Sequence, residues 1–79
     1  MFNITKETVV SDDSVFKFFM ESSVSKQADN FTIDNILDEF DKLGVVIMAH
    51  IYESVQNYLG YLVSKGKLGL DGETYKKVK

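Results

Sequence analysis

Side chains that could carry out acid–base or metal chemistry are few in this sequence. His50 is the only histidine and there is no cysteine, so a metal site would need Asp or Glu as its remaining ligands. The most compact carboxylate cluster is Asp38, Glu39 and Asp41. Helical periodicity places it on a solvated face, whereas acid–base catalysis needs carboxyl groups in a pocket with shifted pKa values. We therefore expect a solvent-facing imidazole, no metal, no cofactor, no small-molecule substrate and no enzymatic activity.

Phosphate binding, by contrast, has candidate groups near the C-terminal end. The sequence contains no Gly-rich phosphate loop, but five of its nine lysines lie from Tyr61 onward, together with only two of its twelve acids. The chain up to Gly60 carries a net charge of −6 and the rest +3, which predicts an acidic body with a basic tail. Arginine, the usual bidentate reader of guanine, is absent. Because most arginine codons begin with CG, this absence suggests an AT-rich viral or bacterial genome.

The elements that position these groups must fit into one small domain. The chain has 79 residues, of which 44% are hydrophobic, and this is enough for a single core. The apolar run over residues 45–49 is far too short to span a membrane, and the N-terminus lacks an apolar run of signal-peptide length. We expect a cytoplasmic protein, located in the host cytoplasm if it is viral. We predict an arm or short strand over residues 1–10 and the folded domain over residues 11–79.

Two helices are predicted before residue 45. Ser11, Asp12 and Asp13 supply an N-cap and first-turn acids for a helix that ends near residues 21–23. Its buried face is predicted to hold Val15, Phe18 and Phe19, while Phe16 lies on the other side and could mark an interface. After a polar loop over residues 25–30, Thr32 and Gly44 bound the second helix. Its apolar residues recur at helical spacing: Ile33, Ile36, Leu37, Phe40 and Leu43.

A third helix and a hairpin are predicted to follow. The helix runs from about residue 47 to residue 65, and Gly66 ends it. Its predicted buried face holds Met48, Ile51, Tyr52, Val55, Tyr58, Leu59, Leu62 and Val63. In the hairpin, the pair Asp71-Gly72 favours a two-residue type I′ turn, which pairs Leu68 with Tyr75 and Lys67 with Lys76. Two like charges placed opposite each other invite an anionic partner.

This order of elements resembles a winged helix-turn-helix domain, and residues at two places carry the resemblance. One is the helix entry over residues 31–37. The other is the run over residues 54–68, where the superfamily has a Leu-x-x-Leu-x-x-x-Gly-x-Leu pattern, matched by Leu59, Leu62, Gly66 and Leu68. Tyr75 falls where the returning strand of the wing usually has an aromatic residue. The resemblance implies an α+β fold with three helices followed by a C-terminal β-hairpin wing.

The resemblance also implies a function, namely binding of double-stranded DNA by a small transcriptional regulator. In DNA-binding members of the superfamily the third helix enters the major groove and the wing touches phosphate or the minor groove. Carried over by position, the base-reading residues would be His50, Ser54, Asn57 and Tyr61. The phosphate contacts would be Lys65, Lys67, Lys76 and Lys77. A homodimer would double this basic surface.

A protein-binding module on the same fold is the alternative hypothesis. The apolar segment over residues 45–49, which includes Val46 and Ile47, and the absence of Arg favour it. In this interpretation a basic protein partner would meet an acidic face formed by Asp12, Asp13, Asp34, Asp38 and Asp41. Such charge complementarity would improve encounter rate and specificity more than affinity. A virus-encoded modulator of host machinery and an oligomerisation domain both belong to this class.

Overall fold

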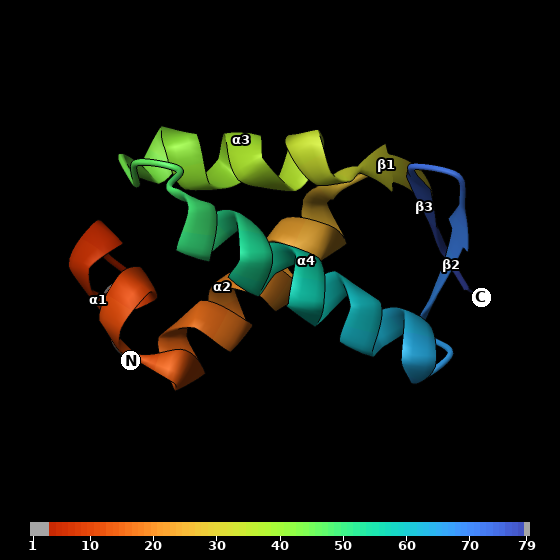
Figure 1. Cartoon of the computed structure of the whole chain (residues 1–79), viewed down its shortest axis with the longest axis horizontal. Helices are drawn as coiled ribbons and strands as arrows, with labels where there is room; N and C mark the ends of the chain where they lie inside the picture. The colour runs from red at the N-terminus through yellow and green to blue at the C-terminus, as the bar shows by residue number, and fades with distance from the viewer. Residues whose placement is uncertain (1–3, 79) are drawn as a thin grey trace.

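The computed structural model describes residues 4–78, which form four helices and one small antiparallel sheet. The elements in chain order are α1 (Lys6–Ser11), α2 (Asp13–Lys26), β1 (Asn30–Thr32), α3 (Ile33–Leu43), α4 (Ala49–Ser64), β2 (Leu68–Asp71) and β3 (Thr74–Lys77). The sheet lies at one end of the molecule and α1 at the other, with α2, α3 and α4 between them (Figure 1). The expected α+β class is confirmed. No helix in residues 4–78 is long and apolar enough to cross a membrane.

The N-terminal segment is a helix, so the prediction of an arm or short strand was wrong for the described part of residues 1–10. Thr5 caps α1, because its Oγ1 accepts from the Thr8 N–H at 3.3 Å and its own N–H donates to Thr8 Oγ1 at 3.0 Å. Val9 is buried in the core. The folded part of the chain therefore begins before residue 11, and residues 1–3 lie outside the described residues.

The core lies where α2, α3 and α4 meet. Its largest fully buried side chains are Phe40, Met20, Ile36, Leu59, Val9 and Val55. Phe40 is the central aromatic residue, since its ring centroid lies 4.8 Å from that of Phe19 and 5.8 Å from that of Phe16. Sequence periodicity had placed Phe18 inside and Phe16 outside, and this was wrong. Phe18 is 51% exposed, whereas Phe16 packs against the core, because α2 is covered on two sides, by α3 and by α4.

The helix boundaries follow their capping residues. Asp12 caps α2 by accepting from the Ser14 N–H at 2.9 Å, but α2 continues to Lys26 and is longer than predicted. The predicted limits of α3 are confirmed, with Thr32 as its N-cap and Gly44 in the left-handed region at a φ of 92°. The last long helix, α4, begins at Ala49, two residues later than predicted.

The sheet has the order β1-β3-β2, so the C-terminal strand lies in the middle. The hairpin is shifted from its predicted register. Asp71 pairs with Thr74 and Leu70 with Tyr75, so the turn residues are Gly72 and Glu73. Gly72 has a φ of 62°, and among residues 4–78 no residue other than Gly has a positive φ, which fits the φ signs of a type II′ turn and excludes type I′.

The shifted register also changes how the hairpin lysines are placed. Lys76 lies opposite Gly69, so the predicted pairing of Lys67 with Lys76 was wrong. Leu68 lies opposite Lys77 and does not pair with Tyr75. Lys67 and Lys76 still share one face of the sheet as diagonal neighbours. Lys67 lies on the same face as Gly69, which is opposite Lys76, whereas Leu68 and Leu70 point to the other face.

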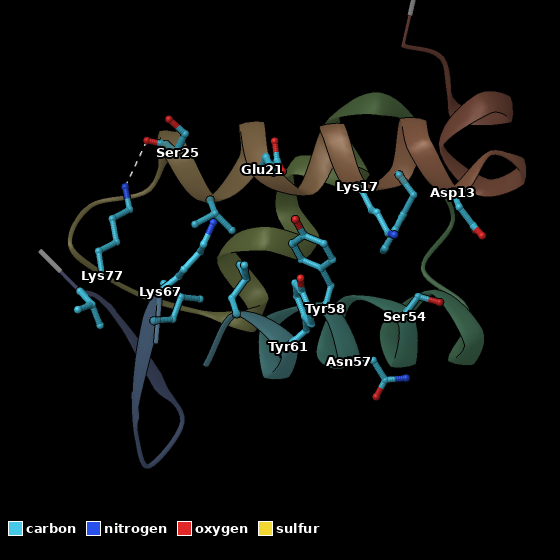
Figure 2. Close-up of a pocket in the computed structure, with 15 residues that line it drawn as sticks. Asp13, Lys17, Glu21, Ser25, Ser54, Asn57, Tyr58, Tyr61, Lys67 and Lys77 are labelled. Carbon is cyan, nitrogen blue, oxygen red and sulfur yellow. Dashed lines mark hydrogen bonds between the residues drawn. The ribbon is translucent and has the colours of Figure 1, made fainter. Parts of the chain in front are cut away.

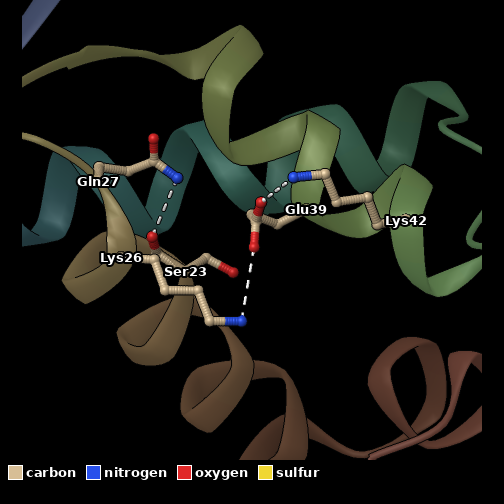
Figure 3. A network of polar contacts seen from close by, with 5 residues as sticks. All are labelled: Ser23, Lys26, Gln27, Glu39 and Lys42. Atoms are coloured by element: carbon tan, nitrogen blue, oxygen red, sulfur yellow. Dashed lines mark hydrogen bonds and ion pairs between the residues drawn. The ribbon is translucent and has the colours of Figure 1, made fainter.

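An ion-pair cluster joins α2 to α3 (Figure 3). Glu39 accepts from Lys42 Nζ at 3.1 Å and lies 3.6 Å from Lys26 Nζ. The hydrogen bond from Lys42 is the main cause that lowers the pKa of the Glu39 carboxyl. Burial opposes it as the second-largest effect, and the charges of Lys42 and Lys26 lower the pKa further. A lowered folded-state pKa means that the ionised carboxylate stabilises the fold above pH 4.5, the ordinary pKa of this group. This contribution is lost as the pH falls through the lowered pKa.

Glu39→Gln therefore lowers the free energy of unfolding at neutral pH by about 0.5–1 kcal/mol. The difference from the wild type shrinks as the pH falls through the lowered pKa, because the wild-type carboxyl then becomes neutral as well. Urea unfolding at several pH values measures this. Glu53→Gln, at an exposed residue of α4 without an ion pair among residues 4–78, is the control. A destabilisation by Glu39→Gln that persists unchanged at low pH would assign its effect to packing.

Ser23 is a second polar feature of this region. It is 1% exposed, and its Oγ has no hydrogen-bond partner among the described residues. Because a buried hydroxyl without a partner is destabilising and Ala has the higher helix propensity, we expect Ser23→Ala to raise the free energy of unfolding by about 0.5–1.5 kcal/mol. Denaturant unfolding measures it, with the exposed Ser25→Ala in the same helix as the control for propensity. An equal gain in both variants would show that the buried hydroxyl costs nothing.

Candidate nucleic-acid interface

A groove lies between α2 and α4 and is closed at one end by the sheet (Figure 2). Its volume is about 1100 Å³. The α4 wall supplies Ser54, Asn57 and Tyr61, and the sheet supplies Lys67 and Lys77. The α2 wall supplies a polar row spaced by one helical turn: Asp13, Lys17 and Glu21. Polar groups of both signs therefore surround the groove.

The floor of the groove is aromatic. The Tyr58 ring meets Phe16 edge to face at a centroid distance of 6.4 Å and lies 6.1 Å from the Tyr61 ring. Burial is the main cause that raises the pKa of the Tyr58 hydroxyl, and the negative charge of Glu21 adds to it. Tyr58 thus keeps its proton at neutral pH and remains a hydrogen-bond donor at the floor of the groove.

Three of the four predicted base-reading residues come together, and the fourth does not. All four are exposed, but Ser54, Asn57 and Tyr61 line the groove with α2, whereas His50 lines a separate hollow beside α1. In Figure 2 Tyr61 points toward α2, while Asn57 points away from it into solvent. The outer face of α4 therefore presents an amide, and its groove side presents a phenol.

The four predicted phosphate-binding lysines differ in whether their ammonium groups are exposed or held by other groups of the protein. Lys65 and Lys67 are exposed, and the Lys65 ammonium lies 5.6 Å from the centroid of the Tyr61 ring. Lys76 is also exposed and forms an ion pair with Asp71 at 3.4 Å. Lys77 differs, because its Nζ donates to the Ser25 carbonyl at 3.3 Å (Figure 2) and to the Gln27 carbonyl at 2.6 Å. Its charge stabilises the C-terminal end of α2.

The charges of α4 itself are sparse. Glu53 is its only charged residue, so the cations of this surface lie beyond its C-terminal end. At its N-terminal end, Met48 is the N-cap and makes no side-chain cap bond, and the first turn holds no acid. The N–H groups of this turn and the positive end of the helix dipole are thus not neutralised locally.

The residues of the alternative hypothesis do not form one surface. Asp12 and Asp13 lie at the junction of α1 and α2, at the opposite edge of the molecule from α3, which carries the exposed Asp34, Asp38 and Asp41 (Figure 1). The predicted apolar pair is exposed, with Val46 at 75% and Ile47 at 36%.

The apolar exposure extends beyond the predicted pair. Val10 and Met48 are 51% and 57% exposed and line the same hollow of about 340 Å³ as Val46 and His50. We call Val10, Val46 and Met48 the apolar patch. Sequence reasoning missed Val10, because it expected no helix there to bring this residue beside α4.

Two further groups bear on what this surface can do. Residues 4–78 contain no cluster of three or more His, Asp or Glu side chains that could hold a metal ion. Lys17, Phe16 and Tyr58 line the groove and were not among the predicted site residues. The i, i+4 spacing of Asp13, Lys17 and Glu21 is a sequence signal that could have identified the α2 wall, and it was not used. Comparisons with protein-family models, curated proteins and solved structures found no match for this chain.

Proposed function

We propose that this chain is a winged helix-turn-helix domain that binds double-stranded DNA through α4 and the β2–β3 hairpin. The observation that carries the proposal is the clustering of exposed lysines around the C-terminal end of α4, beside its exposed polar face. The chain order and the sheet order β1-β3-β2, in which the strand before α3 pairs with the last strand, support the winged-helix part.

In this proposal α4 lies in the major groove and offers hydrogen-bonding groups to base edges. Asn57, which points into solvent, matches the adenine edge, where an amide donates and accepts at the same time. Ser54 lies one turn earlier on α4, whereas Tyr61, one turn later, points toward α2 and lines the groove. Without Arg the surface has no fork-shaped partner for guanine, so A·T-rich sites are favoured.

Phosphate contacts come from the lysines whose ammonium groups are exposed. Lys65 and Lys67 flank the end of α4, and Lys76 lies on the adjoining sheet strand. Lys77 is excluded, because its ammonium group is held by the backbone of α2 and the following loop. At its other end α4 offers N–H groups that no side chain caps, and a helix N-terminus favours a phosphate.

The number of lysines predicts how the binding depends on salt. Each neutralised phosphate contributes about −0.9 to the slope of log K against log salt, so three lysines give a slope of about −2.7. Fluorescence anisotropy with an A·T-rich duplex, titrated at several salt concentrations, measures this slope. The control is Lys77→Gln, which we expect to leave the slope unchanged. Absence of binding at low salt would overturn the proposal, and a slope lowered by Lys77→Gln would overturn the exclusion of Lys77.

The apolar patch favours a second candidate function, docking of a basic protein. Val46 is 75% exposed just before α4, and contiguous exposed apolar side chains mark binding surfaces more often than solvated turns. Glu7 and Lys6 on α1 both line the hollow, and Glu53 lies farther along α4. Val46→Asp/Met48→Asp would abolish capture of a purified basic partner after nuclease treatment, whereas Lys67→Glu/Lys76→Glu would not. The reverse pattern would remove this candidate.

A further inference from the structure

The open edge of the sheet is the surface that the proposed DNA contacts leave unexplained. In the order β1-β3-β2, strand β2 has a neighbour on one side only among the described residues. The Val78 N–H donates to the Lys67 carbonyl at 3.2 Å, and the pairs Gly69–Lys76 and Asp71–Thr74 follow in register. Because hydrogen-bonded and non-hydrogen-bonded pairs alternate in an antiparallel ladder, the N–H and C=O groups of Leu68 and Leu70 point to the open edge.

This edge lacks several of the features that normally prevent pairing with another strand, although β2 has only four residues. Residues 68–71 read Leu-Gly-Leu-Asp, with no Pro, no Lys and no bulge. Leu70 is 53% exposed although it belongs to the strand. Exposed backbone groups beside an exposed leucine form a template on which another strand can pair.

The charges along the edge show which strand fits. Residues 67–71 read Lys-Leu-Gly-Leu-Asp, with opposite charges at the two ends, two leucines and a central glycine. Reversed in direction, as in an antiparallel pair, the same segment places an acid opposite each base. We propose that β2 pairs antiparallel with β2 of a second copy of this chain, about a two-fold axis at Gly69, to form a homodimer with one continuous sheet.

The register of this dimer is fixed by the backbone. With Gly69 opposite Gly69 of the second copy, Leu68 lies opposite Leu70 of the second copy, and these are the residues whose backbone groups point outward. Lys67 then lies opposite Asp71 of the second copy, whose carboxylate it shares with Lys76 of that copy on the same face. A register moved by one residue would place outward-pointing groups opposite inward-pointing ones, so the charge pattern and the backbone pattern select the same alignment.

Both faces of the joined sheet are compatible with this register. Lys67, Gly69 and Asp71 share one face, and the missing side chain of Gly69 leaves room for the Lys–Asp pairs on either side of it. Leu70 lies on the other face with Leu68, whose side chain is already in the core. In the dimer Leu70 is covered by Leu68 of the second copy, which lies opposite it. Because the paired segment spans only residues 67–71, we expect a weak dimer that forms at high micromolar to millimolar concentration, well short of the specific interfaces that bury about 1,200 Å² or more.

Charge reversal tests the dimer without DNA. Sedimentation equilibrium and concentration-dependent amide NMR shifts measure self-association of the wild type. Asp71→Lys and Lys67→Asp each place like charges opposite each other, so each variant alone associates at least about fivefold more weakly. The two variants mixed in equal amounts restore association as a heterodimer, and Lys67→Asp/Asp71→Lys in one chain restores the homodimer. Association of either single variant at wild-type strength, or no recovery in the mixture and the double variant, would overturn the proposal.

A backbone variant tests the edge directly. Leu70→Pro removes an N–H that the β2–β3 ladder does not use, so the hairpin is retained while the open edge loses a donor. Leu70→Thr keeps the N–H and is the matched control. Circular dichroism establishes that both variants are folded. We expect Leu70→Pro to be monomeric and Leu70→Thr to dimerise, and dimerisation of a folded Leu70→Pro would contradict pairing through β2. The proposal does not rest on DNA binding, since every measurement omits nucleic acid.

Discussion

Lys67→Glu/Lys76→Glu lowers the affinity of the protein for duplex DNA by about a hundredfold at roughly 50 mM salt. Both lysines are exposed on one face of the sheet, beside the C-terminal end of α4. Each phosphate contact contributes about one factor of ten at this salt concentration through counterion release, so loss of two contacts accounts for the effect. The slope of log K against log salt falls at the same time from about −2.7 to about −1.

A variant with the same change of net charge separates local contacts from the overall field. Lys26→Glu/Lys42→Glu reverses two exposed lysines at the contact of α2 with α3, away from the outer face of α4. Because both lysines pair with Glu39, circular dichroism first establishes that this variant is folded. We expect this variant to lose less than about threefold in affinity, as a change of long-range field alone would produce. Equal losses in the two double variants would show that the hairpin lysines have no special place in binding.

Phe40→Ala has the largest expected effect on stability, a loss of about 3–5 kcal/mol in the free energy of unfolding. Phe40 is 0% exposed and its ring meets Phe19 edge to face at a centroid distance of 4.8 Å. Truncation leaves a cavity at the contact between α2 and α3 that the surrounding helices cannot fill. A domain of this length has a total stability of only about 4–12 kcal/mol, so the variant is close to unfolded at room temperature.

Phe18→Ala is the matched control for Phe40→Ala. Phe18 is 51% exposed on α2, so its truncation costs about 1 kcal/mol or less. Chemical denaturation of both variants measures the difference. A loss at Phe18 as large as that at Phe40 would mean that α2 is turned the other way, with the orientation that sequence periodicity alone had predicted.

The elements that local sequence determines were predicted well, and those that depend on tertiary contacts were not. Thr32 and Gly44 define α3 because capping and a left-handed glycine are local effects. Helical periodicity could not distinguish Phe16 from Phe18, because α2 contacts two other helices and its buried face is wider than one stripe. The N-terminal helix was missed because its capping box uses Thr8 where Glu or Gln is usual.

The candidate site shows the same division. The spacing of Ser54, Asn57 and Tyr61 on one helix was visible in the sequence, and the structure places all three at one groove. Lys77 was predicted as a phosphate contact, but its ammonium group lies on carbonyls about 50 residues earlier in the chain. The hairpin register depended on a single choice between Asp71 and Gly72 as the first turn residue, and only Gly tolerates the positive φ without cost.

Amide chemical-shift mapping of the labelled protein with an A·T-rich duplex is the most direct measurement of the proposed DNA interface. If α4 and the hairpin bind DNA, the largest shift changes fall on Ser54, Asn57, Tyr61, Lys65, Lys67 and Lys76, and they disappear as salt is added. Absence of shift changes at low salt would contradict DNA binding, and changes confined to Val10, Val46 and Met48 would contradict the assignment of the interface to α4 and the hairpin.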